Sequence, residues 1–156
     1  MAQMTFVPMT RDEVAALRLG AGANHYRGCA ATPSLVASME GDTVREEAEY
    51  AALSNAGVLA LVVKPSSPRL VVAAEVPEEQ ITDLRQPQGE VEVHGLSWAM
   101  VRALFADEPE AREAVSMATE AVAGRSLAAS LTAPEVAAVL DQYDLLWFAP
   151  EELDQL

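Results

Sequence analysis

The sequence has 156 residues, and its 24 acidic and 10 basic side chains give a formal net charge of −14. A chain of this length can bury about two-thirds of its unfolded surface, so it needs neither a disulfide nor a metal to fold. The acid excess argues against general nucleic-acid binding and against anionic membrane surfaces, because both need clustered cationic side chains. The 51% of hydrophobic residues argues against disorder.

The use of cysteine and the apolar runs indicate a cytoplasmic protein. Cys29 is the only cysteine, which excludes an internal disulfide and suits a reducing compartment. The longest apolar run, residues 58–63, is far shorter than the roughly 20 residues that span a bilayer. The pattern of a signal peptide is not seen. We therefore expect no membrane partner.

The first third of the chain alternates between strand and helix patterns. Residues 4–8 and 26–31 are predicted strands, the second rich in small residues. Between them, Thr10 and Glu13 have the spacing of a capping box that begins a helix, and Gly20 is a natural end for it.

A short helix and a long helix are predicted next. Thr32 can cap a helix over residues 33–39, in which proline occupies the first turn. Thr43 and Glu46 have the spacing of a second capping box, followed by helically spaced alanines. We place one long helix from 44 to about 62.

The middle of the chain is predicted to supply most of the sheet. Residues 70–76 are apolar and β-branched, which favours a central strand. Residues 77–89 are expected to form a loop with at most one helical turn. The alternation of Glu and Val over 90–94 is typical of a half-buried strand. Residues 97–106 fit either helix or strand, and we favour a turn at 98–100 followed by a strand at 101–106.

Two further helices are predicted from their first turns. Asp107 and Glu110 have capping-box spacing, as do Thr132 and Glu135, and each pair encloses a proline. The segment between the two helices, residues 124–131, is expected to be a loop.

The order of these elements predicts an α+β fold. Residues 145–148 are apolar throughout and are predicted to form an interior strand. Residues 90–106 hold two strands that are too close in sequence for a helical crossover. We expect one domain over residues 1–156, with a mixed, largely antiparallel sheet of about five or six strands packed with helices.

Five short motifs spread over the chain are shared with a known family: Val7-Pro8, Thr32-Pro33-x-Leu35, Glu49-Tyr50-Ala51-Ala52-Leu53, Val71-Val72-Ala73-Ala74 and Asp144-Leu145-Leu146-Trp147-Phe148. With these motifs the chain resembles, nearly end to end, a family of small uncharacterised actinobacterial proteins of unknown function. The resemblance implies the organisation of the elements and no catalytic residues. It departs from the family at 97–105, where the relatives look more plainly like a strand.

Four residues are the candidates for a ligand site. His25, Tyr26 and Arg27 form the densest polar-aromatic cluster, which suits recognition of a small anion or an acidic side chain, or simply an exposed junction between loop and strand. Tyr50 lies among alanines on the long helix, where its ring can pack while its hydroxyl reaches outward, or where it can belong to the core.

Other chemical signatures are weak. His25, His94 and Cys29 lack the close pairing typical of zinc ligands, so we expect no metal site. Cys29 has only His25 nearby as a base, and a small buried side chain is the simpler interpretation. The glycines around Gly22 do not have the spacing of a nucleotide-binding loop, and we expect no cofactor.

One carboxylate-rich segment stands apart from the helix starts. Asp141 and Asp144 flank Tyr143 just before the last predicted strand, where they indicate the rim of a cleft or a solvated turn. The remaining carboxylate pairs lie in caps, first turns and loops, where the helix dipole explains them.

Two functional hypotheses follow. The first is a non-catalytic protein-interaction or regulatory domain, acting as a homodimer or on a partner with basic residues, because no catalytic or cofactor signature is present. The second is a small-molecule-binding domain or a cryptic enzyme, with its site near His25, Tyr26, Arg27 and Tyr50. Mimicry of nucleic acid is disfavoured because the carboxylates are spread over many helix starts.

Overall fold

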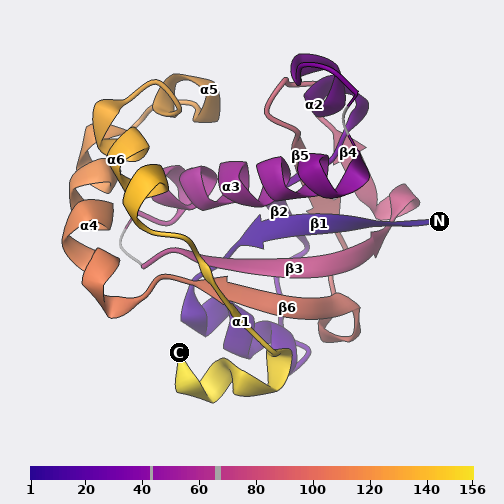
Figure 1. Ribbon diagram of the computed structural model, residues 1–156. Helices are drawn as coiled ribbons and strands as arrows, with labels where there is room; N and C mark the ends of the chain where they lie inside the picture. Colours follow the sequence, from indigo (N-terminus) through magenta and orange to yellow (C-terminus); the bar gives the residue numbers. More distant parts are fainter. Residues whose placement is uncertain (43, 66–67) are drawn as a thin grey trace.

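A computed structural model describes residues 1–42, 44–65 and 68–156 (Figure 1). They form one open sheet of seven strands in the order β4-β5-β2-β1-β3-β6-β7, and every neighbouring pair is antiparallel. The predicted α+β class is confirmed. The strands are β1 (Ala2–Pro8), β2 (His25–Ala30), β3 (Leu70–Pro77), β4 (Ile81–Asp83), β5 (Glu90–His94), β6 (Val101–Ala106) and β7 (Leu146–Phe148).

Helices cover both faces of the sheet. Figure 1 shows α3 lying along the sheet with α2, α4, α5 and α6 on the same side, while α1 and the C-terminal turns lie on the other side. The α-helices are α1 (Arg11–Arg18), α2 (Pro33–Ser38), α3 (Arg45–Val63), α4 (Arg112–Ala121), α5 (Leu127–Ser130) and α6 (Pro134–Gln142). The 3-10 turns are η1 (Glu78–Gln80), η2 (Trp98–Met100), η3 (Pro109–Ala111) and η4 (Pro150–Gln155).

The alternation of side chains along the strands divides the core into two layers. Phe6, Cys29 and Val71 point toward α3, whereas Val7 and Val72, their neighbours in sequence, point toward α1. Successive side chains of a strand face opposite sides of the sheet, so strands buried on both faces contain continuous apolar runs. This explains why β1 and β3 lie in the middle.

The long helix α3 packs closely on the sheet because its buried face is made of small residues. Ala48, Ala52, Ala56 and Gly57 are all buried in the packed face. Alanine favours the helix and leaves little side-chain bulk between backbone and sheet. The sequence expectation of one long helix is confirmed, and its C-cap is Lys64.

Several predicted local features are confirmed. The Thr10 hydroxyl accepts a hydrogen bond from the Glu13 amide at 3.1 Å, and the Glu13 carboxylate accepts one from the Thr10 amide at 2.9 Å, which completes the capping box. Gly20 ends the helix region with φ +79°, a left-handed value that favours glycine. The ambiguous segment 97–106 is a 3-10 turn followed by a strand, as favoured.

Other predictions are wrong in detail. The expected loop at 77–89 contains the edge strand β4, and the expected loop at 124–131 contains the one-turn helix α5. Both elements are short, so neither repeats its hydrophobic period even twice, and the sequence pattern cannot identify it. Thr43, half of the second predicted capping box, lies outside the described residues, and Val44 is the N-cap of α3.

Two predicted capping boxes and the interior strand are also wrong. The Thr132 hydroxyl donates to the carbonyl of Ala129, and the N-cap of α6 is Ala133. Asp107 takes part in a buried ion pair described below. The strand β7 lies at the edge of the sheet, where the Trp147 side chain is 60% exposed. The prediction failed because an apolar run indicates a strand but not its position in the sheet.

Among the described residues, every helix is too short or too polar to cross a membrane.

Candidate functional site

A cleft of about 890 Å³ opens at the end of the sheet where β3 begins and β6 ends. We call it the end cleft. Apolar side chains of the strands and of α4 form much of its wall, and polar side chains of α1 and α4 lie at its margin. Residues that define it include Leu70, Ala106, Val115, Leu146 and Phe148 for the wall, and Arg11, Asp12, Arg112, Ser116 and Thr119 for the margin.

Beside this cleft lies a buried ion pair that the fold builds from two neighbouring strands. Arg69 precedes β3 and Asp107 follows β6, and antiparallel pairing brings these two ends together. The Arg69 side chain is 3% exposed and that of Asp107 is 5% exposed. Both side chains therefore exchange nearly all of their water contacts for each other, which demands close geometry.

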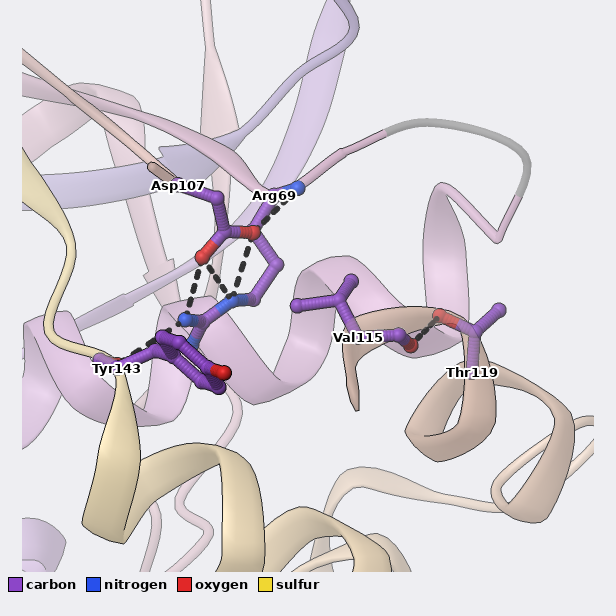
Figure 2. Close-up of polar contacts among 5 residues, drawn as sticks. All are labelled: Arg69, Asp107, Val115, Thr119 and Tyr143. Atoms are coloured by element: carbon purple, nitrogen blue, oxygen red, sulfur yellow. Dashed lines mark hydrogen bonds and ion pairs between the residues drawn. The ribbon is translucent and has the colours of Figure 1, made fainter. Parts of the chain in front are cut away.

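The two side chains of the pair are joined by several hydrogen bonds (Figure 2). Nη2 of Arg69 donates to Oδ1 of Asp107 at 2.6 Å, and Nε donates to both carboxylate oxygens at 3.1 Å. The Arg69 amide donates to Oδ2 at 3.0 Å, and Nη2 also donates to the carbonyl of Tyr143 at 3.3 Å. The pair therefore ties the sheet to the segment after α6.

Arg69 also lines a smaller pocket, of about 220 Å³. We call it the α3–α6 pocket. Its walls are Tyr50, Leu53 and Ser54 of α3, Leu140 of α6, and the segment Tyr143, Asp144 and Leu145. Arg69 lines both the end cleft and this pocket.

Gly57 makes room for the arginine between the helix and the sheet. A Cβ atom at this position would lie 3.3 Å from Nη1 of Arg69 and 3.3 Å from Cδ1 of Leu145. Glycine inside a helix costs about 1 kcal/mol relative to alanine. Here the missing methyl group lets the guanidinium and Leu145 approach the backbone of α3.

The charges around the end cleft nearly cancel, in contrast to the net charge of the whole chain. Arg11 and Arg112 oppose Asp12 and Glu108 at the margin, and the buried pair is neutral. Arg112 forms no ion pair with any described residue, and Arg11 has one long bond, 3.4 Å, to the carbonyl of Leu153. The cleft therefore offers two guanidinium groups to a ligand.

The structure does not bring the four sequence candidates to one cavity. Tyr26 is buried toward α1, and its hydroxyl accepts a hydrogen bond from the Ala23 amide at 2.7 Å. His25 and Arg27 point to the opposite, exposed face of β2 because side chains alternate along a strand. Tyr50 is 66% exposed on α3 and borders the α3–α6 pocket.

The exposed face of β2 has its own cross-strand contacts. Nη2 of Arg27 donates to Oε2 of Glu90 at 2.9 Å, and His25 lies opposite His94 with ring centroids 6.0 Å apart. These are pairs between adjacent strands in a polar sheet surface. Within the described ranges 1–42, 44–65 and 68–156, three or more potential ligands nowhere gather closely enough to hold a metal ion.

Cys29 is fully buried under α3. Burial, with a smaller contribution from the nearby Glu90 carboxylate and opposition from Arg27, raises the pKa of its thiol to about 12. His25 is four residues away on the same strand, about 13 Å at the usual rise per residue. The arrangement is that of a packing residue.

Sequence reasoning missed the two residues that matter most at this site, Arg69 and Asp107. The sequence pattern predicts a capping box at Asp107 because a carboxylate before a proline-containing turn is typical of one. The sequence does carry a signal for this pair: Arg69 directly precedes one apolar strand and Asp107 directly follows another. Once 70–76 and 101–106 are paired antiparallel, these two residues must meet at one end of the sheet.

The carboxylate-rich segment gave the better signal for the smaller pocket. Asp144 and Tyr143 do line the α3–α6 pocket, together with Tyr50, while Asp141 lies outside its lining. The signal in segment 141–144 is that its polar residues come just before an apolar strand.

Comparisons with known proteins bear on family membership. Neither the curated proteins nor the solved structures contain a significant match to the chain. The model of a family of unknown function, DUF6912, matches residues 4–156. The match covers nearly the whole chain, and the protein is therefore a member of the DUF6912 family.

Proposed function

We propose that the protein is a small-molecule-binding domain and that its ligand occupies the end cleft. The carrying observation is the cleft itself, about 890 Å³ in volume, with apolar walls and two guanidinium groups at its margin. Ligand sites are typically clefts of about 300–1,000 Å³ with mostly apolar walls and a few placed polar groups. The end cleft has both properties.

The polar groups define the kind of ligand. Arg11 and Arg112 are available to an acceptor such as a carboxylate or a sulfonate, whereas Leu70, Val115 and Phe148 suit an apolar body. A polyphosphate is disfavoured because Asp12 and Glu108 balance the two arginines. We therefore propose an amphipathic organic molecule of low charge, bound by an intracellular, non-catalytic domain.

The proposal is tested with the anionic fluorescent dye anilinonaphthalene sulfonate. Ser116 is exposed on α4 and lines the cleft, so Ser116→Trp fills the cleft from a position that the core does not use. Met117→Trp is the matched control, because Met117 is 57% exposed on the same helix and outside the lining of the cleft. Thermal unfolding of each variant verifies the fold, since partly folded chains also bind this dye.

The expected result is saturable binding with one site per chain, lost in Ser116→Trp and retained in Met117→Trp. Equal binding by both variants, or no saturable binding by the unsubstituted protein, contradicts the proposal.

A second candidate function, self-association, rests on the edge strand β7. Its outer edge pairs with no described strand, and its residues Leu146 and Trp147 are 41% and 60% exposed. Antiparallel pairing of β7 with the same strand of a second copy gives a two-fold symmetric dimer. Light scattering after size exclusion tests this, with a dimer that Trp147→Glu converts to a monomer as the expected result. A monomeric unsubstituted protein at high concentration excludes it.

A further inference from the structure

The lining of the α3–α6 pocket includes an arginine, Arg69, with N–H donors that its described partners do not use. A guanidinium has five N–H donors, and those of Arg69 on Nε and Nη2 are directed to Asp107 and to the Tyr143 carbonyl. Among the described residues, Nη1 has no hydrogen-bond partner, and it lies beside Gly57 of α3, the helix that also supplies Tyr50, Leu53 and Ser54 to the pocket. Arg69 lines this pocket, its side chain is 97% buried, and the two N–H groups of Nη1 are the donors that its described partners leave unused.

The walls define the size and the apolar character of an occupant. Tyr50, Leu53, Ser54 and Gly57 have the i, i+3, i+4, i+7 spacing of one helix face, and the first three line the pocket. Leucines of three segments, Leu53, Leu140 and Leu145, line it as well. A volume of about 220 Å³ is below the usual range for drug-sized ligands and suits a molecule of about ten heavy atoms.

The charges restrict the occupant further. Asp107 already neutralises Arg69, and Asp144 adds an exposed carboxylate at the rim. A simple anion would meet the donors of Nη1 but would be repelled by Asp144. A simple cation would meet Asp144 but could not accept hydrogen bonds from Arg69. A molecule that carries a carboxylate and an ammonium group close together offers a partner to Arg69 and to Asp144.

We propose that the α3–α6 pocket binds a small zwitterion, an α-amino acid with a branched apolar side chain. Its carboxylate accepts hydrogen bonds from Nη1 of Arg69, its ammonium group pairs with Asp144, and its side chain packs among the leucines. This site is separate from the end cleft. Ser54 belongs only to the pocket and Ser116 only to the cleft, so the two proposals are tested by different variants.

Three probes of the same shape separate the two charges. L-Leucine carries both groups, 4-methylpentanoate lacks the ammonium group, and 3-methylbutylamine lacks the carboxylate. Titration calorimetry and amide shifts in NMR spectra measure their binding to the full chain. We expect the order leucine, then 4-methylpentanoate, then 3-methylbutylamine, with shifts at Ser54, Tyr143 and Leu145. No saturable binding of leucine, or equal binding of leucine and 4-methylpentanoate, overturns the proposal.

Two aspartates provide a matched pair of variants. Asp144→Asn removes the rim carboxylate, and Asp141→Asn removes an exposed carboxylate of α6 that lies outside the pocket lining. Because exposed ion pairs are weak, Asp144→Asn is expected to lower the affinity for leucine about two- to fivefold. The ratio of the affinities for leucine and 4-methylpentanoate is expected to fall with it. Asp141→Asn is expected to leave the leucine affinity and this ratio unchanged. Equal effects of the two substitutions overturn the assignment of Asp144.

A third variant tests the location without touching a charge. Ser54→Leu fills the pocket from α3 and places a good helix former in the helix. It is expected to abolish leucine binding, while the thermal unfolding profile and the dye binding in the end cleft stay as in the unsubstituted protein. Retained leucine binding in this variant places the site elsewhere and overturns the proposal.

Discussion

At the scale of single residues, Arg69 and Asp107 show how one sequence pattern supports two structures. A carboxylate before a proline-containing turn usually caps a helix, and Asp107 has that position. In the fold its carboxylate accepts hydrogen bonds from the guanidinium and the backbone of Arg69 instead. The choice depends on which strands pair, and that information is spread over the chain rather than held near Asp107.

The buried pair predicts a large loss of stability when one partner is removed. Arg69→Met leaves the Asp107 carboxylate buried without its cation, which costs about 3–5 kcal/mol in the free energy of unfolding. Arg18→Met is the control, because the Arg18–Asp154 pair is exposed, with side chains 35% and 76% accessible, and is expected to cost at most about 1 kcal/mol. Urea unfolding measures both. Similar losses for the two variants contradict the account of the buried pair.

At the scale of elements, segments with a clear sequence pattern were predictable, whereas β4 and α5 were not. Helically spaced alanines indicated the first half of α3, and the alternation of Glu and Val indicated β5. The strand β4 has three residues and α5 has four, so tertiary contacts decide their conformation. The apolar run of β7 predicted a strand correctly, but not its place at the edge, because sheet order is a property of all strands together.

An ion pair links α1 to α3, and its contribution to stability is expected to depend on pH. Nζ of Lys64, the C-cap of α3, lies 2.9 Å from Oε1 and 3.0 Å from Oε2 of Glu13 in α1. Burial favours a higher pKa for Glu13, but the hydrogen bonds from Lys64 and from the Thr10 amide outweigh it and lower the pKa below its usual value. A carboxyl group with a lowered pKa in the folded state stabilises the fold above its unfolded pKa, and this stabilisation is lost as the pH falls through the folded value.

A double-mutant cycle tests this link. Glu13→Gln preserves the capping box and removes the charge, while Lys64→Met removes the cation. The coupling free energy between the two positions is expected to be about 0.2–1 kcal/mol at pH 7 and close to zero at pH 3. Urea unfolding at both pH values gives the cycle. A coupling of equal size at the two pH values shows that the interaction is not ionic.

At the scale of the whole molecule, the α+β class followed from the sequence, but the candidate site did not. The sequence candidates His25, Tyr26 and Arg27 are consecutive on β2, and strand alternation sends Tyr26 into the core, away from its neighbours. The end cleft is built from α1, β3, β6, α4 and β7, which are distant in sequence. Of the predicted residues, Tyr50, Tyr143 and Asp144 do meet, at the smaller pocket.

The central claim is that the end cleft binds a small molecule, and NMR mapping of amide shifts with a library of small aromatic carboxylates tests it most directly. The account predicts that the bound compounds shift the amides of Asp107, Val115, Thr119 and Phe148, and that these shifts disappear in Ser116→Trp. Compounds that shift only amides elsewhere, or shifts at the cleft that persist in Ser116→Trp, contradict it.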